Sequence, residues 1–167
     1  MDEIAAAAEV TKLTIYRRFP AKEDLLLSVV DHEIEDLKKA VQIAEGTTGS
    51  ALNRLHAVAL TLFESVVSQV SVSICQMYFM KAEGSARLSE RSLHWRSVLR
   101  DALVPAIRNV LEAQGDRDGE TLELADVLFE LIAAQGWQLA LGFISRDEDT
   151  LRKSFDARWS FFARQFN

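Results

Sequence analysis

The sequence predicts an all-α fold, and three observations lead to that prediction. Only two Pro and seven Gly interrupt 167 residues. Apolar residues recur at three- and four-residue steps through most of the chain, which is the pattern of helices that bury one face. No stretch sustains the alternation of a β-strand. With 49% hydrophobic and 26% charged residues, the chain has the balance of a globular protein. We therefore predict about eight helices around a core.

The first two predicted helices are short and meet at a turn. Residues 2–8 (DEIAAAA) favour a helix because alanine has the best intrinsic propensity and acidic residues stabilise an N-terminal end. Thr11 is a typical N-cap for a second helix over residues 12–19. Pro20 ends that helix because proline lacks the backbone donor. The pair has the shape of a helix-turn-helix.

Longer helices are predicted in the rest of the chain. An amphipathic helix covers residues 22–44, and Gly46 and Gly49 close it. Pro105 predicts a kink or break within a later helix. The remaining expected elements are helices near 50–66, 70–83, 89–113, 120–144 and 147–166, with a loop over 115–119.

Charge and composition narrow the class of function. A net charge of -6 argues against a protein that coats nucleic acid along its whole surface. The segment from Thr11 to Lys22, however, contains four basic residues and no acidic one, so it is the natural place for a polyanion. No transmembrane or signal-peptide pattern is present, and the single cysteine, Cys75, excludes an internal disulfide. These features favour a cytoplasmic protein without a membrane segment.

The segment IAAAAEVTKLTIYRRFPAKEDLL, residues 4–26, resembles the signature of the TetR family of bacterial transcription regulators. The residues in register with that signature are Ile4, Ala5, Ala8, Val10, Thr11, Thr14, Ile15, Tyr16, Phe19, Lys22, Glu23, Leu25 and Leu26. The resemblance implies a helix-turn-helix DNA-binding region with a connecting helix, here residues 1–44, followed by a helical ligand-sensing and dimerisation domain, residues 45–167. It also implies three partners: a double-stranded DNA operator, a small-molecule effector and a second copy of the chain.

Roles within the DNA-binding segment follow from placement. Thr11 and Tyr16 are positioned for phosphate contacts, and the resemblance implies the same role for Lys22. The front of the second helix carries the residues we assign to base edges: Lys12, Leu13, Thr14 and Arg17. A small apolar core is expected from Ile4, Ala8, Val10, Ile15 and Phe19. Without the resemblance, a solvated basic helix with a buried tyrosine would explain the same residues at least as well.

Three features depart from the family pattern. Glu9 stands where glycine is usual, and a left-handed backbone there would cost roughly 1 kcal/mol. Leu13 replaces a small residue. Family members also carry a complete helix before this segment, and none precedes Met1 here, so we expect either a start placed too late in the reading frame or a truncated regulator. Because the apolar patch under that helix would be uncovered, we predict weak or no specific DNA binding.

The rest of the chain is assigned by pattern and by analogy with the family fold. Large apolar residues on the last two long helices predict a dimer interface, and they are Leu124, Leu128, Leu131, Phe155, Trp159 and Phe162. Aromatic and sulfur-containing residues of the middle helices predict a ligand pocket, and they are Phe63, Val67, Cys75, Tyr78, Phe79, Trp95 and Trp137. The alternative for both sets is ordinary core packing.

No catalytic or metal-binding motif is recognisable, so we predict no enzyme activity and no cofactor. His32-Glu33 begins a zinc-type helix motif, but Asp36 takes the place of the second histidine. The prediction from sequence is thus a DNA-binding transcription regulator, a repressor released from its operator by a small apolar ligand. The alternative is a dimeric helical ligand-binding or interaction module that has lost specific DNA binding.

Overall fold

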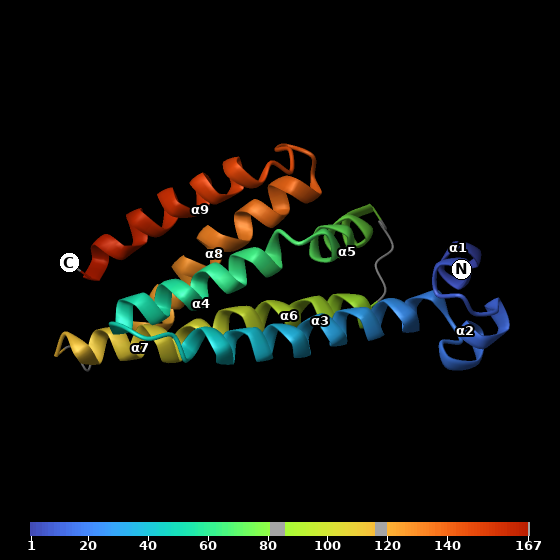
Figure 1. Ribbon diagram of the computed structural model, residues 1–167, viewed down its shortest axis with the longest axis horizontal. Helices are drawn as coiled ribbons and strands as arrows, with labels where there is room; N and C mark the ends of the chain where they lie inside the picture. The colour runs from blue at the N-terminus through green and yellow to red at the C-terminus, as the bar shows by residue number, and fades with distance from the viewer. Residues whose placement is uncertain (81–85, 116–119, 167) are drawn as a thin grey trace.

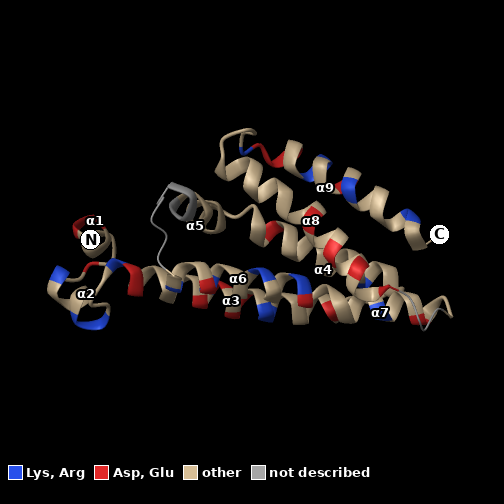
Figure 2. Cartoon of the chain, turned by 180° about the vertical axis from the view of Figure 1, so that it is seen from behind, with Lys and Arg blue, Asp and Glu red and all other residues tan. Residues whose placement is uncertain are grey.

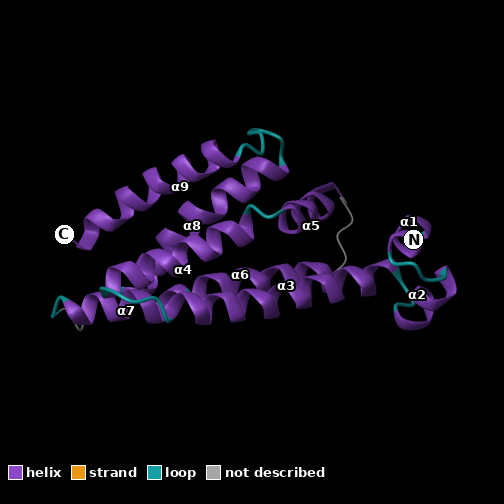
Figure 3. Ribbon diagram, viewed as in Figure 1, coloured by secondary structure: helices purple, strands orange, loops and turns teal. Residues whose placement is uncertain are grey.

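The computed structural model describes residues 1–80, 86–115 and 120–166, apart from the side chains of residues 77–80. Within these ranges the secondary structure is entirely helical (Figures 1 and 3). This confirms the predicted all-α fold. The elements are α1 (Asp2–Ala7), α2 (Lys12–Arg18), α3 (Lys22–Glu45), α4 (Ala51–Val66), α5 (Gln69–Met80), α6 (Ala86–Asp101), α7 (Leu103–Ala113), α8 (Thr121–Ala140), α9 (Glu148–Ala163) and a 3-10 turn (Arg164–Phe166).

Side-chain caps begin four of the described helices, one of them α5, where the Ser71 N–H donates to Ser68 Oγ over 3.1 Å. The backbone N–H of Thr14 donates to Thr11 Oγ1 over 3.1 Å at the start of α2. Ser50 Oγ accepts in the same way at the start of α4, and Asp147 Oδ2 accepts from the Thr150 N–H at the start of α9. Each cap satisfies a donor that the first helical turn leaves unpaired. The predicted starts near Thr11, Ser50 and Asp147 are therefore confirmed.

The helix predicted over residues 89–113 is divided into two. α6 ends at Asp101, and α7 begins at Leu103. Pro105 is the cause, because it cannot donate to the Asp101 carbonyl four residues earlier and its ring would clash with that carbonyl. Of the two outcomes predicted at Pro105, the break is the one observed.

The helix predicted over residues 120–144 is shorter in the structure. α8 ends at Ala140, and the chain reverses through Gly142, whose φ is +73°. The Phe143 N–H donates to the Gln138 carbonyl and the Gly142 N–H to the Leu139 carbonyl, the paired bonds of a glycine C-cap. The apolar run continues past Ala140, so periodicity alone overestimated the helix.

The helices form an elongated body with a small projection at one end. α3 is the longest helix and packs along α4 and α6, while α8 lies across α4, α5 and α7 (Figure 1). α1 and α2 stand beyond the body at the start of α3 (Figure 1). We call residues 1–21 the reading head. The side chains at the centre of the body are almost fully buried and come from α4, α7, α8 and α9: Leu55, Val58, Leu62, Leu103, Ile107, Leu128, Phe155 and Phe162.

α4 and α5 meet at a sharp bend. Taken one at a time, the helices in the described part of the chain are not long and apolar enough to cross a bilayer. α4 together with the first part of α5 passes the test of length and composition, but the two are bent by 53°.

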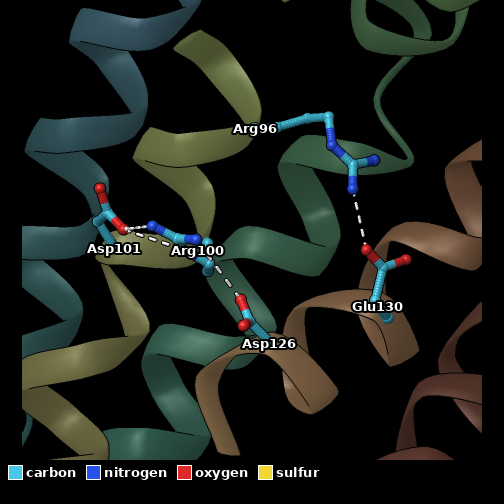
Figure 4. A network of polar contacts seen from close by, with 5 residues as sticks. All are labelled: Arg96, Arg100, Asp101, Asp126 and Glu130. Atoms are coloured by element: carbon cyan, nitrogen blue, oxygen red, sulfur yellow. Dashed lines mark hydrogen bonds and ion pairs between the residues drawn. The ribbon is translucent and has the colours of Figure 1, made fainter. Parts of the chain in front are cut away.

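Four arginines tie α6 to helices on both sides of it. Arg87 and Arg91, in the first half, pair with carboxylates of α3. Arg96 Nη2 lies 2.9 Å from Glu130 Oε1 of α8 (Figure 4). The Arg96 guanidinium also lies over the Phe129 ring. Arg100 pairs with its neighbour Asp101 and lies 3.7 Å from Asp126 of α8 (Figure 4). α6 is thus held to α3 at one end and to α8 at the other.

Candidate nucleic-acid interface

The turn between α1 and α2 is a tight C-cap built around Glu9. The Val10 N–H donates to the Ala5 carbonyl and the Glu9 N–H to the Ala6 carbonyl, which is the Schellman pattern. This pattern needs a left-handed residue after the cap, and Glu9 has a φ of +53°. The left-handed backbone considered at this position in the sequence is therefore confirmed, on a residue that carries a Cβ.

The contact between the two short helices is smaller than the sequence suggests. α1 and α2 are in contact, and their buried residues are Ala5 and Ile15, with 6% and 7% of their surface exposed. Ile4 and Val10 are about 40% exposed. Ala8 is exposed as well, and Phe19 is half-buried. The predicted five-residue core is therefore wrong for Ile4, Ala8 and Val10, because a two-helix corner has only one inner face.

The outer face of α2 is open to solvent. Every residue of α2 other than Ile15 is exposed, and Leu13, at 61%, and Tyr16, at 40%, are large apolar or aromatic groups. The predicted contact residues of this segment are all exposed: Thr11, Lys12, Leu13, Thr14, Tyr16, Arg17 and Lys22. Figure 2 shows the basic residues gathered on α2 and at the start of α3.

Two internal contacts shape this basic surface. Lys12 Nζ lies 2.9 Å from Asp2 Oδ1 of α1, and this pairing lowers the pKa of Asp2 and raises the pKa of Lys12. Thr11 Oγ1 and Thr14 Oγ1 are 2.8 Å apart. In any contact with DNA, the nucleic acid must therefore compete with the Asp2 carboxylate for the Lys12 ammonium group.

The start of α3 completes the surface. Asp24 Oδ2 accepts from the Ala21 N–H over 3.0 Å and closes the first turn. Arg87 and this backbone bond both lower the pKa of Asp24. Lys22 lies exposed at the first position of the helix, next to the end of α2. Arg18, which the predicted set omits, stacks over the Phe19 ring at 5.7 Å from its centroid.

Comparison with known proteins agrees with this geometry. Residues 1–29 match the family described as bacterial regulatory proteins, tetR family. This opening segment is similar to the TetR family. It is also 35% identical over 66 residues to the HTH-type transcriptional activator FasR of Mycolicibacterium smegmatis. That alignment covers 40% of this chain and 30% of the relative's length, so it concerns one segment of the relative and not the whole protein. Both matches are named as regulatory proteins, and neither name describes an enzyme.

The predicted pocket residues of this chain divide between two places. Cys75, Trp95 and Trp137 line one cavity between the helices of the body, together with Val66, Arg96, Leu99, Phe129, Ala133 and Gly136. Phe63 and Val67 instead line an open, polar groove between α4 and the start of α9. Tyr78 and Phe79 lie outside the described side chains. The predicted pocket set omits Arg96, which lines the cavity. The feature that could have pointed to it is a charged residue within a stretch of helix that is otherwise half-buried.

The cavity between the body helices is narrow, at about 30 Å³. This volume suits a water molecule and not a ligand. One of its lining residues, Trp95, is 91% buried, and its indole N–H has no hydrogen-bond partner among the described residues. An unpaired buried donor is uncommon, because a buried polar group without a partner costs free energy. The cavity is therefore lined by aromatic rings, by the Trp95 indole N–H, and by Arg96, which also forms an ion pair with Glu130.

The predicted dimer residues fall into two classes. Leu128, Phe155 and Phe162 are at most 1% exposed inside the subunit, so the prediction that they face a partner is wrong. Leu124, Leu131 and Trp159 are half-buried. The large apolar residues of α8 and α9 that remain exposed are Leu122, Val127 and Phe161. The apolar residues that repeat along α8 therefore lie on both buried and exposed sides of the helix.

Proposed function

We propose that this chain acts as a DNA-binding transcription regulator that reads its operator with α2. The observation that carries the proposal is the exposed, basic outer face of α2 within the segment that matches the TetR family. A short helix with a capped start, held by one small contact and free on its outer side, suits insertion into a major groove. The relative's name, a transcriptional activator of the helix-turn-helix type, supports the same class of function.

In this proposal the side chains divide into two roles. Thr11, Tyr16 and Lys22 contact phosphates and set the register of α2, and they supply affinity that falls with salt. Arg17 contacts a base edge, with guanine as the favoured partner because the guanidinium can donate to both of its major-groove acceptors. Lys12, Leu13 and Thr14 complete the base-reading face.

The test is a selection of duplexes from a random library, followed by titration of the selected sequence. We expect Arg17→Ala to cost about 1–3 kcal/mol and to relax the preference at one base pair. We expect Lys22→Ala to weaken all sequences alike and to reduce the salt slope by about 1. Arg152→Ala on α9 is the matched control. DNA binding that neither reading-head substitution changes would overturn the proposal and leave the alternative, a module without specific DNA binding. The same titration tests the prediction that this chain binds its operator weakly.

We further propose that a small, largely apolar effector enters the cavity lined by Cys75, Trp95 and Trp137. Entry requires the helices around the cavity to separate, since ligand pockets commonly measure about 300–1,000 Å³. A ligand that binds the separated form better shifts the population toward it. Trp95 and Trp137 report on the cavity, whereas Trp159 lies on α9, outside its lining. We expect effectors found in a library of small apolar compounds to change the fluorescence of a Trp159→Phe variant and not that of the Trp95→Phe/Trp137→Phe double variant.

We also propose a homodimer formed through α8 and α9. Leu124, Val127 and Leu131 are spaced three and four residues apart on α8, so they lie on one side of the helix; Val127 is 51% exposed there, and the other two are half-buried. Light scattering tests this contact. We expect Val127→Glu to give monomers, while Leu93→Glu, at an exposed leucine of α6, leaves the dimer intact. A dimer that survives Val127→Glu and also Leu131→Glu would count against this interface.

The direction of regulation stays a prediction. A repressor released by its ligand is the expectation from sequence, whereas the relative that matches part of this chain is named as an activator. A reporter gene placed behind the selected operator distinguishes the two, because a repressor lowers expression and an activator raises it.

A further inference from the structure

The first turn of α3 is where the reading head joins the body. Pro20 ends α2, and α3 begins two residues later at Lys22. Asp24 lies in that first turn and uses its two carboxylate oxygens for different partners. Oδ2 accepts from the Ala21 N–H over 3.0 Å, and Oδ1 accepts from Arg87 Nη1 of α6 over 3.0 Å. One carboxylate therefore touches both the backbone of the junction and a helix of the body.

A second ion pair joins the same two helices farther from the junction. Arg91 Nε, one turn after Arg87 on α6, lies 3.1 Å from Asp31 Oδ1 of α3. The Asp31 carboxylate is half exposed, whereas that of Asp24 is only 27% exposed. Asp31 lies nine residues after Lys22, the first residue of α3, and does not cap the start of the helix. Its pair with Arg91 therefore holds α3 to α6 without contacting the reading head. Both are pairs of an arginine with an aspartate. They differ because the Asp24 carboxylate also accepts a backbone hydrogen bond at the α2–α3 junction.

We propose that Asp24 is a positioning residue that couples α6 to the reading head, with Arg87 holding the carboxylate that closes the α2–α3 junction. When Arg87 withdraws, the carboxylate loses the partner that fixes its direction, and the first turn of α3 is held by the single bond to Ala21. The coupling sets how firmly α2 is oriented relative to the body. It deepens the proposed function and rests on it for its effect on DNA.

The same helix places the coupling within reach of the effector cavity. Arg96 lines that cavity and follows Arg87 by nine residues, about 13 Å along α6. A helix transmits a displacement over that length as a rigid element. An effector that displaces α6 at Arg96 therefore moves Arg87 relative to Asp24.

The competing role for Asp24 is a local helix cap with no link to α6. The two roles are separated by changing Arg87, which does not touch the cap. Asp24→Asn removes the charge that binds Arg87 but keeps an oxygen that can accept from Ala21. Arg87→Lys keeps the charge, and Arg91→Gln is the matched control at the neighbouring pair.

The experiment measures hydrogen exchange of the amides of residues 1–21 in the full chain. We expect Arg87→Gln and Asp24→Asn each to speed exchange about two- to five-fold, the range that an exposed ion pair supports. The double variant should show no further increase, Arg87→Lys should restore slow exchange, and Arg91→Gln should leave these amides unchanged. Unchanged exchange in Arg87→Gln, or an equal effect of Arg91→Gln, would overturn the coupling. Thermal unfolding of each variant verifies that the body remains folded.

A DNA titration of the same variants separates this inference from the proposed function. If both hold, Arg87→Gln alters affinity for the selected duplex by a similar two- to five-fold and Arg91→Gln does not. If the exchange result holds and the chain shows no α2-dependent DNA binding, the coupling stands and the proposed function fails. Altered DNA affinity with unaltered exchange would remove the coupling and retain the function.

Discussion

Gly136 of α8 lies directly against Val66 of α4. A Cβ built on Gly136 would be 2.5 Å from Val66 Cγ1 and 3.0 Å from the Val66 carbonyl oxygen. Both distances are closer than a methyl group tolerates, so α8 can approach α4 this closely only because residue 136 has no side chain. Both residues also line the cavity between the body helices. The size of that cavity therefore depends on this helix crossing.

We expect Gly136→Ala to destabilise the protein although alanine is the better helix former. The gain in propensity is about 1 kcal/mol, whereas overpacking costs about 2–3 kcal/mol when the neighbour is a stiff, branched side chain and a backbone carbonyl. Urea unfolding measures the difference. In a Val66→Ala background the same substitution should cost less, and an equal cost in both backgrounds would show that the contact with Val66 is not the cause.

Glu9→Gly should stabilise the reading head. Glycine adopts the φ of +53° at this turn without the clash that a Cβ causes, and we expect a gain of about 1 kcal/mol. Glu9→Ala keeps the Cβ and removes the charge, so it is the control for the electrostatic effect. Hydrogen exchange at Val10, whose amide donates across the turn, should slow in the glycine variant only. Slowing in both variants would assign the effect to the charge.

His56 should make the protein less stable as the pH falls from about 7.5 to 5.5. Its ring lies between α4 and α9, 4.8 Å from the Trp159 ring and 5.7 Å from the Phe155 ring. Burial lowers the pKa of His56, and nearby Arg152 lowers it further, while Asp156 opposes the shift. Because the folded pKa lies below the unfolded value near 6.5, the unfolded state binds the proton first, and stability falls as the pH drops below that value.

The measurement for His56 is the urea midpoint at both pH values in the wild type and in His56→Gln. We expect the dependence over this window to be smaller in the variant, since glutamine does not titrate. His94→Gln, at an exposed histidine of α6, is the control and should keep the wild-type dependence. The same slope in all three proteins would exclude His56 as the source.

Asp2→Asn should strengthen DNA binding by the proposed interface. The substitution releases Lys12 from its 2.9 Å ion pair and removes a negative charge beside α2. A lysine ammonium freed from the carboxylate adds one positive charge to the surface that meets DNA and therefore adds to counterion release, so the salt slope should steepen by about 1. Asp36→Asn removes an equivalent exposed pair with Lys39 on α3, far along the helix, and should change neither affinity nor slope. A salt slope that stays constant in Asp2→Asn would show that Lys12 does not reach DNA.

Helix starts could be predicted from the sequence because the signals that form them are local. Thr11, Ser50 and Asp147 accept hydrogen bonds from residues three positions later, so their effect needs no other part of the chain. Pro105 acts locally too, through the carbonyl four residues before it. The exposure of the proposed contact residues of α2 could be predicted for the same reason, since a seven-residue helix with one buried side chain, Ile15, leaves its other positions exposed.

The faces of the long helices could not be assigned in this way. Leu128 and Val127 are adjacent in sequence and equally apolar, yet Leu128 is 1% exposed and Val127 is 51% exposed. Phe63 and Trp95 were placed in one predicted pocket, yet they line different hollows. Spacing shows that a helix has apolar faces, but it does not show which neighbour covers each face.

By itself, the amino-acid sequence determined where the helices capped by Thr11, Ser50 and Asp147 begin, that a capped basic helix follows a tight turn, and which family the opening segment resembles. These features depend on groups within about four residues of each other. Only the tertiary structure decided which apolar face is core, how closely α8 approaches α4, and that Asp24 joins Arg87. Those contacts bring together residues tens of positions apart, and close packing of particular side chains selects among arrangements that the periodicity allows equally.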